Sequence, residues 1–282
     1  MKTIRPADIP TAQMHALMLG SIGPRPIAFA STISRSGQVN LSPFSFFNCF
    51  GSNPPTLVFS PTRRVRENTT KHTLENVYEV PEVVINVVNY AMVEQMSLAS
   101  SEYDKGVNEF VKAGFTEEPS IMVRPPRVKE SPVQYECKVR RIIPLGKQGG
   151  SGNLIVCQVV LAHFREDIFD NKGQIDPYKI DLVARMGGDW YCRAQGNAIF
   201  EVAKPVGKGI GVDALPEKIR FSKVLTGNHL GKLGNTVAVP TLEELSAVVI
   251  PDEFSHLQGH HLAAALLDAN LVQAAWKVLL SD

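Results

Sequence analysis

The sequence lacks the features that would direct it to a membrane or to a nucleic acid. No apolar run approaches the ~20 residues that a membrane-spanning helix needs. The 29 basic and 28 acidic residues leave a net charge of +1, so no strong field attracts nucleic acid or an anionic lipid surface. The N-terminus also lacks the long apolar core and cleavage site of a signal peptide. We therefore expect a cytoplasmic protein with neither nucleic-acid nor membrane partners.

Cysteine is scarce, and its spacing argues against two common kinds of site. The four cysteines form no CxxC pair, which removes support for zinc sites and thioredoxin-like redox motifs. His256 and His260 place two imidazoles one helical turn apart, but no third ligand or preceding acid accompanies them. We therefore predict no metal site and four reduced thiols. Only Cys49 lies in a segment suited to a ligand, and without a neighbouring cysteine we expect it not to be a redox thiol.

What the sequence does contain is an ordinary globular composition arranged as many short strands. Its 282 residues are 44% hydrophobic and 20% charged, which suffices for a well-buried core. Short β-branched runs alternate with turns as far as residue 160 and helical patterns are few, so we predict a mainly β, antiparallel barrel fold. Predicted strands cover 27–34, 56–60, 83–88, 135–143 and 153–164, and predicted helices cover 73–79, 90–101 and 107–113.

The pattern changes near residue 196, so residues 1–195 are predicted to form the main domain and 196–282 a C-terminal extension. Thr241 followed by two glutamates predicts a helix over 241–249. Residues 262–280, rich in alanine and leucine, predict one long helix that is apolar on most faces. Such a helix needs cover, so we expect the extension to pack on the barrel or on a partner subunit. It would either wall a ligand site or fix a dimer, or it would simply seal one barrel end.

Residues 40–60 carry the strongest indication of a ligand site. The segment NLSPFSFFNCFGSNPPTLVFS contains five phenylalanines, and the first four alternate with hydroxyl and amide groups, among them Ser42, Ser45 and Asn48. Flat heteroaromatic ligands are held in this way, by apolar walls with a few hydrogen-bonding groups. The alternative is an aromatic-rich core loop.

A basic loop that precedes a predicted helix is the second candidate. Arg63 and its basic neighbours lead through Lys71 to Thr73, a hydroxyl at the expected start of the helix. A helix N-terminus has free N–H groups and a positive partial charge, which suit a phosphate. A solvated basic loop explains the same residues equally well. His163 is a lone histidine on a predicted strand, and such histidines are usually structural. Beside a redox ligand, however, a histidine can supply a proton.

Seven segments in a fixed order resemble the flavin reductase-like, FMN-binding split-barrel family, which includes flavoredoxins and flavin reductase partners of monooxygenases. The stretch from the first segment to the last, Gly23 to about Arg193, covers roughly two thirds of the chain. The segments are GPRPIAFAST (23–32), NLSPFSFFN (40–48), NPPTLVFS (53–60), KHTLENV (71–77), INVV (85–88), PSIMVRPPRVKESPVQYEC (119–137) and IDPYKIDLVARMGGDWYCR (175–193). The family usually shows Lys-Asp-Thr where this chain has Lys71-His72-Thr73, which puts the role of position 72 in doubt.

The resemblance implies a six-stranded antiparallel split β-barrel that forms homodimers, with FMN near the subunit interface. The flavin ring would lie against residues 40–48, and Ser60, Arg63, Lys71 and Thr73 would hold its phosphate. Arg25 is a candidate for either the ring edge or the phosphate. The implied cofactor-binding residues are Arg25, Asn40, Ser42, Ser45, Asn48, Cys49, Ser60, Arg63, Lys71 and Thr73.

The implied activity is that of an NAD(P)H-dependent flavin reductase that passes a hydride from NADH or NADPH to flavin, for onward transfer to an acceptor. His163 and Tyr191 would border the face where nicotinamide stacks, and no protein acid or base is required because the flavin performs the chemistry. The alternative is a flavoredoxin-like electron carrier that works with redox protein partners. A third possibility is a split barrel that no longer binds flavin.

Overall fold

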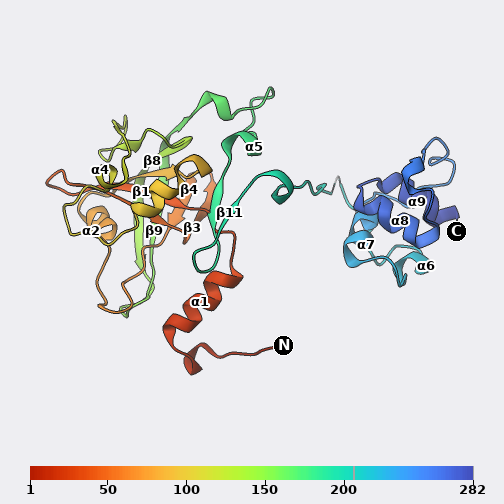
Figure 1. Ribbon diagram of the computed structural model, residues 1–282, viewed down its shortest axis with the longest axis horizontal. Coiled ribbons are helices and arrows are strands. Elements are labelled where there is room, and N and C mark those ends of the chain that lie inside the picture. The colour runs from red at the N-terminus through yellow and green to blue at the C-terminus, as the bar shows by residue number, and fades with distance from the viewer. Residues whose placement is uncertain (206, 282) are drawn as a thin grey trace. The chain divides into compact units, whose positions relative to one another are not determined.

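The computed structural model describes residues 1–205 and 207–281. The chain forms two compact units, Met1–Phe200 and Glu201–Asp282, each of which is described separately (Figure 1). The division falls between residues 200 and 201, close to the expected boundary after residue 195. None of the described helices is long and apolar enough to cross a membrane.

The first unit is built on one antiparallel sheet of seven strands, in the order β2-β1-β5-β8-β9-β4-β3. The sheet confirms the mainly β prediction, but the strand count is seven rather than six. Strands β2 and β3 stand at the two ends of that order, so the sheet is not closed. The strands are β1 (Ala28–Ile33), β2 (Val39–Phe44), β3 (Phe47–Ser52), β4 (Pro55–Phe59), β5 (Glu82–Val87), β8 (Val133–Pro144) and β9 (Asn153–Phe164).

Two small ribbons accompany this sheet. One pairs β6 (Glu117–Glu118) with β7 (Arg127–Val128), and the other pairs β10 (Val183–Arg185) with β11 (Tyr191–Arg193). The residues 40–60 account for the higher strand count, because they contain β2, β3 and β4 and not one strand after a loop. Strand β3 is exposed along nearly its whole length, so it lacks the alternation that identifies a half-buried strand.

The helices of the first unit are short. They are α1 (Thr11–Ser21), α2 (His72–Glu79), α3 (Val93–Leu98), α4 (Glu109–Ala113) and α5 (Pro177–Ile180), with 3-10 turns η1 (Pro6–Asp8), η2 (Tyr90–Met92), η3 (Glu166–Ile168) and η4 (Gly196–Ala198). Helix α1 was not predicted. The helix expected over 90–101 is instead η2 followed by α3. Asn108 caps α4, since its side chain accepts the N–H of Phe110.

Strand β1 separates two apolar layers because its side chains alternate between the faces of the sheet. Phe29 points into a cluster with Leu41 and the methionines of η2 and α3. Ala28 and Ala30 point to the opposite side, where the cluster includes Leu74 and Val77 of α2. The small alanine side chains allow α2 to lie close to the sheet, and this packing fixes where α2 begins.

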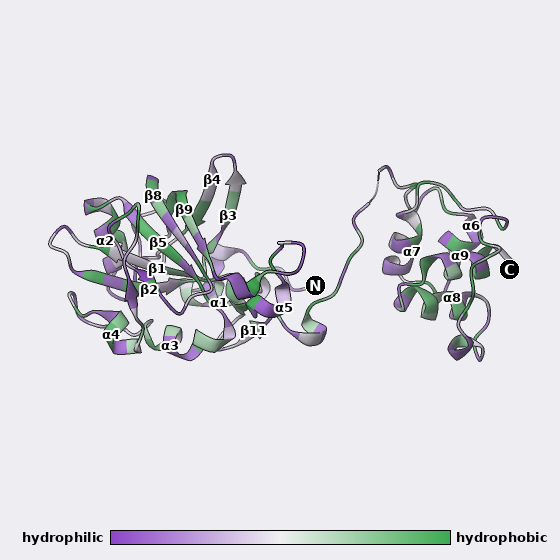
Figure 2. Cartoon of the chain, turned by 90° about the horizontal axis from the view of Figure 1, so that it is seen from above, coloured by the Kyte–Doolittle hydropathy of each residue, from purple (hydrophilic) through white to green (hydrophobic). Residues whose placement is uncertain are grey.

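The second unit consists of α6 (Glu217–Arg220), α7 (Gly227–Gly234), η5 (Asp252–Phe254), α8 (Gly259–Asp268) and α9 (Val272–Ser281). It has its own core, in which Trp276 is fully buried. Figure 2 shows hydrophobic residues, in green, along α8 and α9 of this unit. The single helix predicted over 262–280 is wrong: Asn270 adopts φ 60° and separates α8 from α9. Residues 262–280 are apolar on most faces because α8 and α9 pack against each other and against α7.

The helix predicted over 241–249 is also wrong, because the segment forms turns. The capping interaction that motivated the prediction is nevertheless present. Thr241 Oγ1 accepts the N–H of Glu244 at 3.2 Å, and Glu244 Oε2 accepts the N–H of Thr241 at 2.7 Å. A capping box therefore forms here without a helix to follow it.

Candidate functional site

The candidate site lies at the start of α2. The first N–H groups of an α-helix have no partner within the helix. Lys71 is the N-cap residue and supplies no side-chain cap, while its carbonyl accepts the N–H of Leu74 at 2.9 Å. The N–H groups of His72 and Thr73 are thus left without an acceptor from the N-cap side chain. They form the positive end of the helix dipole, which favours an anion.

A narrow cleft opens at this helix end. Its interior of about 20 Å³ exceeds only slightly the 10–15 Å³ that a water needs, so it can admit phosphate oxygens but not a flavin ring system. Four of the predicted cofactor-binding residues meet here although they come from separate segments. The lining includes Asn40, Ser42, Arg64, Lys71, His72, Thr73, Glu102, Tyr103 and Glu109.

A buried hydrogen-bond network fixes the floor of the cleft. Thr73 Oγ1 donates to Asn40 Oδ1 at 2.7 Å, and Asn40 Nδ2 donates to Glu109 Oε1 at 2.7 Å. Glu109 also accepts the N–H of Leu41 at 2.9 Å, which ties α4 to β2. Burial raises the pKa of Glu109 above its usual value, and these hydrogen bonds oppose the rise. Because the Thr73 hydroxyl already donates to Asn40, the backbone N–H of Thr73 is the group left for an anion.

Arg64 and Lys71 supply the positive charge of the cleft. Arg64 is held by Thr69 Oγ1 at 3.0 Å and by the Thr70 carbonyl at 2.6 Å. Both cations also contact Glu102, with Arg64 Nε at 3.1 Å and Lys71 Nζ at 3.4 Å from Oε1. The predicted Arg63 does not line the cleft, because its guanidinium closes the loop by bonding to the side chain and carbonyl of Asn68.

The hairpin loop between β8 and β9 braces the basic loop from behind. Arg63 N–H donates to the Ser151 carbonyl at 2.9 Å, and Gly150 N–H donates to the Arg63 carbonyl at 3.0 Å. A Cβ atom at Gly149 would stand 2.5 Å from the carbonyl oxygen of Val65, so only glycine fits there. Ser60, also predicted at the phosphate, lies in this brace, where its Oγ accepts the N–H of Asn153.

The remaining residues predicted for the ring lie along β3 and its turn. Ser45 is half-buried in the turn before β3, whereas Asn48 and Cys49 are exposed on that strand. Asn48 Oδ1 accepts the N–H of Cys49 at 2.8 Å. Cys137 and Cys157 are buried, and burial raises the pKa of Cys137 to about 12.

Arg25 is turned toward backbone carbonyls. Its Nη1 donates to the carbonyls of Leu19 and Ile22 near the end of α1, and its Nη2 donates to the Met186 carbonyl at 2.6 Å. Burial, followed by the charge of Arg185, lowers its pKa. Only its buried Nε lacks a partner among the described residues. Arg25 therefore joins α1 to the turn between β10 and β11.

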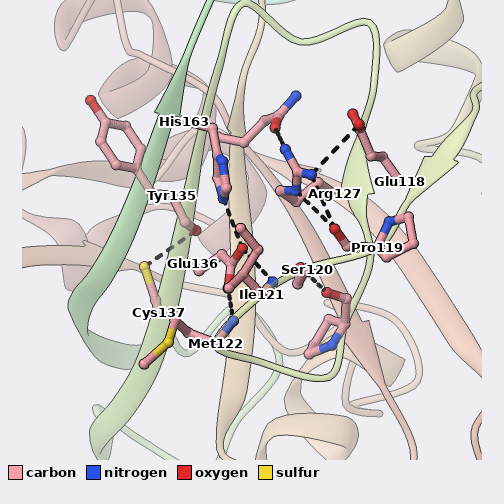
Figure 3. Close-up of polar contacts among 12 residues, drawn as sticks. Glu118, Pro119, Ser120, Ile121, Met122, Arg127, Tyr135, Glu136, Cys137 and His163 are labelled. Carbon is pink, nitrogen blue, oxygen red and sulfur yellow. Dashed lines mark hydrogen bonds and ion pairs between the residues drawn. The ribbon is translucent and has the colours of Figure 1, made fainter.

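His163 and Tyr191, predicted for the nicotinamide face, have separate surroundings. His163 Nε2 lies 2.8 Å from Glu136 Oε1 on the neighbouring strand (Figure 3). Glu136 is fully buried and also accepts the N–H groups of Ile121 and Met122. Burial alone would raise the pKa of Glu136, but these donors hold it below its usual value. Tyr191 instead stacks with the Arg185 guanidinium, 4.6 Å from its ring centre.

Figure 3 also shows how the loop between β6 and β7 is anchored at this pair. Arg127 donates to the Pro119 carbonyl and to Gln134 Oε1, and it pairs with Glu118. Two side chains therefore hold this loop in place by hydrogen bonds, Arg127 at its end and Glu136 beneath it. The sequence argument missed Glu136, since nothing in a strand pattern distinguishes a buried glutamate from an exposed one.

The sequence matches the family model of the flavin reductase like domain over residues 20–179. An uncharacterized protein of Aquifex aeolicus is 36% identical over 189 residues, covering 67% of this chain and 94% of that protein.

Two solved structures resemble the first unit. Nitrilotriacetate monooxygenase component B from Bacillus cereus matches with a TM-score of 0.67 and 28% identity, covering 72% of this chain and 98% of that one. The 2-nitrobenzoate 2-nitroreductase NbaA of Pseudomonas fluorescens matches with a TM-score of 0.65 and 29% identity, covering 73% and 98%.

Proposed function

The chain belongs to the flavin reductase-like, FMN-binding split-barrel family, and from that membership we propose that it binds FMN and passes a hydride from NADH or NADPH to flavin. The observation that carries the proposal is the uncapped N-terminus of α2 beside two cations. Lys71 and Arg64 would neutralise the phosphate, and the N–H groups of His72 and Thr73 would donate to it. Bound flavin would supply the electron transfer, while these residues only bind and orient it.

The ring system would lie outside the cleft. Ser42 lines the cleft, and the turn with Ser45 and the exposed β3 face with Asn48 follow it along the chain. Hydroxyl, amide and backbone N–H groups there would hydrogen-bond the polar edge of the ring and stabilise negative charge on it. Arg64 takes the phosphate role that the sequence argument gave to Arg63.

A flavin titration tests the phosphate site. We expect Lys71→Ala and Arg64→Ala each to weaken FMN by roughly 1.5–3 kcal/mol, the worth of one charge-assisted contact. Riboflavin, which has no phosphate, should bind the variants and the wild type alike. Arg66→Ala is the matched control, because it removes a positive charge from the same loop at an exposed position outside the cleft lining. Equal losses for both flavins would move the phosphate elsewhere.

The electron donor and acceptor need a separate experiment. The absorption spectrum of the FMN-loaded protein should bleach under NADH or NADPH in the absence of air. Slow bleaching by both nucleotides, with rapid reduction by a redox protein, would favour the flavoredoxin-like alternative. The likeness to a monooxygenase component and to a nitroreductase supports testing both a flavin-using partner and a directly bound acceptor.

We also propose a homodimer in which the extension packs on the first unit or on the partner subunit. Exposed apolar side chains support this, including Phe50 on the edge strand β3 and Phe221 and Val249 in the extension, which are 69%, 63% and 81% exposed. Light scattering on the full chain measures the oligomeric state.

A further inference from the structure

One carboxylate oxygen already occupies the anion position of the cleft. Glu102 Oε1 lies 3.1 Å from Arg64 Nε and 3.4 Å from Lys71 Nζ, so a single oxygen bridges the two cations. A phosphate oxygen placed between the same donors would make the same two contacts. Carboxylate and phosphate therefore cannot both hold this position.

Glu102 is placed to leave that position. Its side chain is 64% exposed, and it lies on the segment that follows α3 and forms one wall of the cleft. Among the described residues its carboxylate contacts only these two cations. Exposed ion pairs of this kind are weak, so a ligand can displace the carboxylate at small cost. The hydrogen bond from Arg64, and then the charge of Lys71, lower the pKa of Glu102, so the carboxylate stays charged at neutral pH.

The other acid of the cleft does not behave in this way. Glu109 is buried, and its two oxygens accept from Asn40 Nδ2 and from the Leu41 N–H. Burial also raises its pKa, which reduces the charge it presents to a ligand. Glu102 is thus the exposed anion of the site, and Glu109 is part of its wall.

We propose that Glu102 is a specificity-determining residue that competes with the flavin phosphate for Arg64 and Lys71. The competition lowers the affinity for FMN and leaves the affinity for riboflavin unchanged. It therefore reduces the ratio of the FMN affinity to the riboflavin affinity. This inference rests on the proposed placement of the phosphate at the start of α2.

Glu102→Gln tests the competition by removing the charge at constant size. Glu67→Gln is the matched control, because Glu67 is an exposed acid of the basic loop that lies outside the cleft lining. The flavin-free protein is titrated with FMN and with riboflavin, and quenching of the flavin fluorescence gives each affinity. Inorganic phosphate competing against FMN provides a second readout that does not depend on the ring.

We expect Glu102→Gln to tighten FMN by about three- to tenfold, from two exposed ion pairs, with riboflavin unchanged. Inorganic phosphate should compete at correspondingly lower concentration. Glu67→Gln should shift FMN by less than about twofold, since screening weakens a charge that makes no contact.

Three outcomes overturn the inference, and they differ in whether the proposed phosphate site also fails. If Lys71→Ala weakens FMN but Glu102→Gln leaves FMN unchanged or weaker, the phosphate lies in the cleft and Glu102 does not compete. If Lys71→Ala and Arg64→Ala leave FMN unchanged as well, the phosphate lies elsewhere and the proposed site fails together with the competition. An equal gain in Glu67→Gln would show a general charge effect and would also overturn it.

Discussion

His72 is the first residue of α2, and we expect it to give the site a pH dependence. Burial lowers its pKa below the usual 6.5, and Arg64, Lys105 and Lys71 lower it further, while Glu75 opposes them. His72 is therefore neutral at pH 7. A phosphate beside it would favour the imidazolium and raise that pKa in the complex.

The sign of the effect follows from linkage. If bound FMN raises the pKa of His72, binding takes up a proton, and the affinity rises as the pH falls through the pKa of the complex toward the lower pKa of the free protein. The phosphate itself titrates near pH 6 in every variant, so the informative quantity is a ratio. We expect the wild-type affinity for FMN, divided by that of His72→Asn, to rise between pH 7.5 and pH 5.5. Titrations of both proteins across this range measure it, and a flat ratio would separate His72 from the phosphate.

At this scale the sequence located the loop and some, but not all, of the side chains that line the cleft. The basic run and the following hydroxyl identified Lys71 and Thr73, which do line it. The choice between Arg63 and Arg64 depends on Asn68, whose φ of 52° brings its side chain and carbonyl to Arg63. Glu102 comes from a segment far along the chain, so no local pattern could place it there.

Among the elements, the two loops that support the cleft are coupled by backbone contact. The hairpin loop between β8 and β9 lies against residues 63–65, with Gly149 at the closest approach. We expect Gly149→Ala to displace the basic loop and to weaken FMN by about 1–2 kcal/mol, the cost of an overpacked contact. Riboflavin should be much less affected. Titrations with the two flavins measure the difference.

Gly20→Ala is the control for this prediction, because a Cβ at Gly20 meets nothing within 4 Å. It should leave both affinities unchanged. If Gly149→Ala binds FMN as tightly as the wild type, the brace has no part in holding the cations in place.

The elements that the sequence predicted well are those that alternate or form β-branched runs. Strands β5, β8 and β9 were predicted within a few residues, since each has a buried face. Strand β3 was missed because it is exposed, and helices α8 and α9 were joined because no proline or glycine marks Asn270. The tertiary contact between α8 and α9, which decides where the chain turns, is not visible in local propensity.

For the whole molecule, each apolar core belongs to one unit. The cluster around Trp276 contains only residues of the second unit, and the clusters around Phe29 and Phe59 contain only residues of the first. The family domain, residues 20–179, likewise lies within the first unit. Each unit therefore has an apolar core of its own.

Truncation after Phe200 separates folding from function. Because no core residue is lost from the first unit, the chain 1–200 should fold with a cooperative thermal transition, and the chain 201–282 should be helical by circular dichroism. If the extension walls the flavin site or fixes the dimer, the truncated chain should bind FMN more weakly or scatter light as a monomer. A truncated chain that keeps the mass of a dimer and the affinity of the full chain would contradict that role. That result would leave the other expectation from the sequence, an extension that only seals one barrel end.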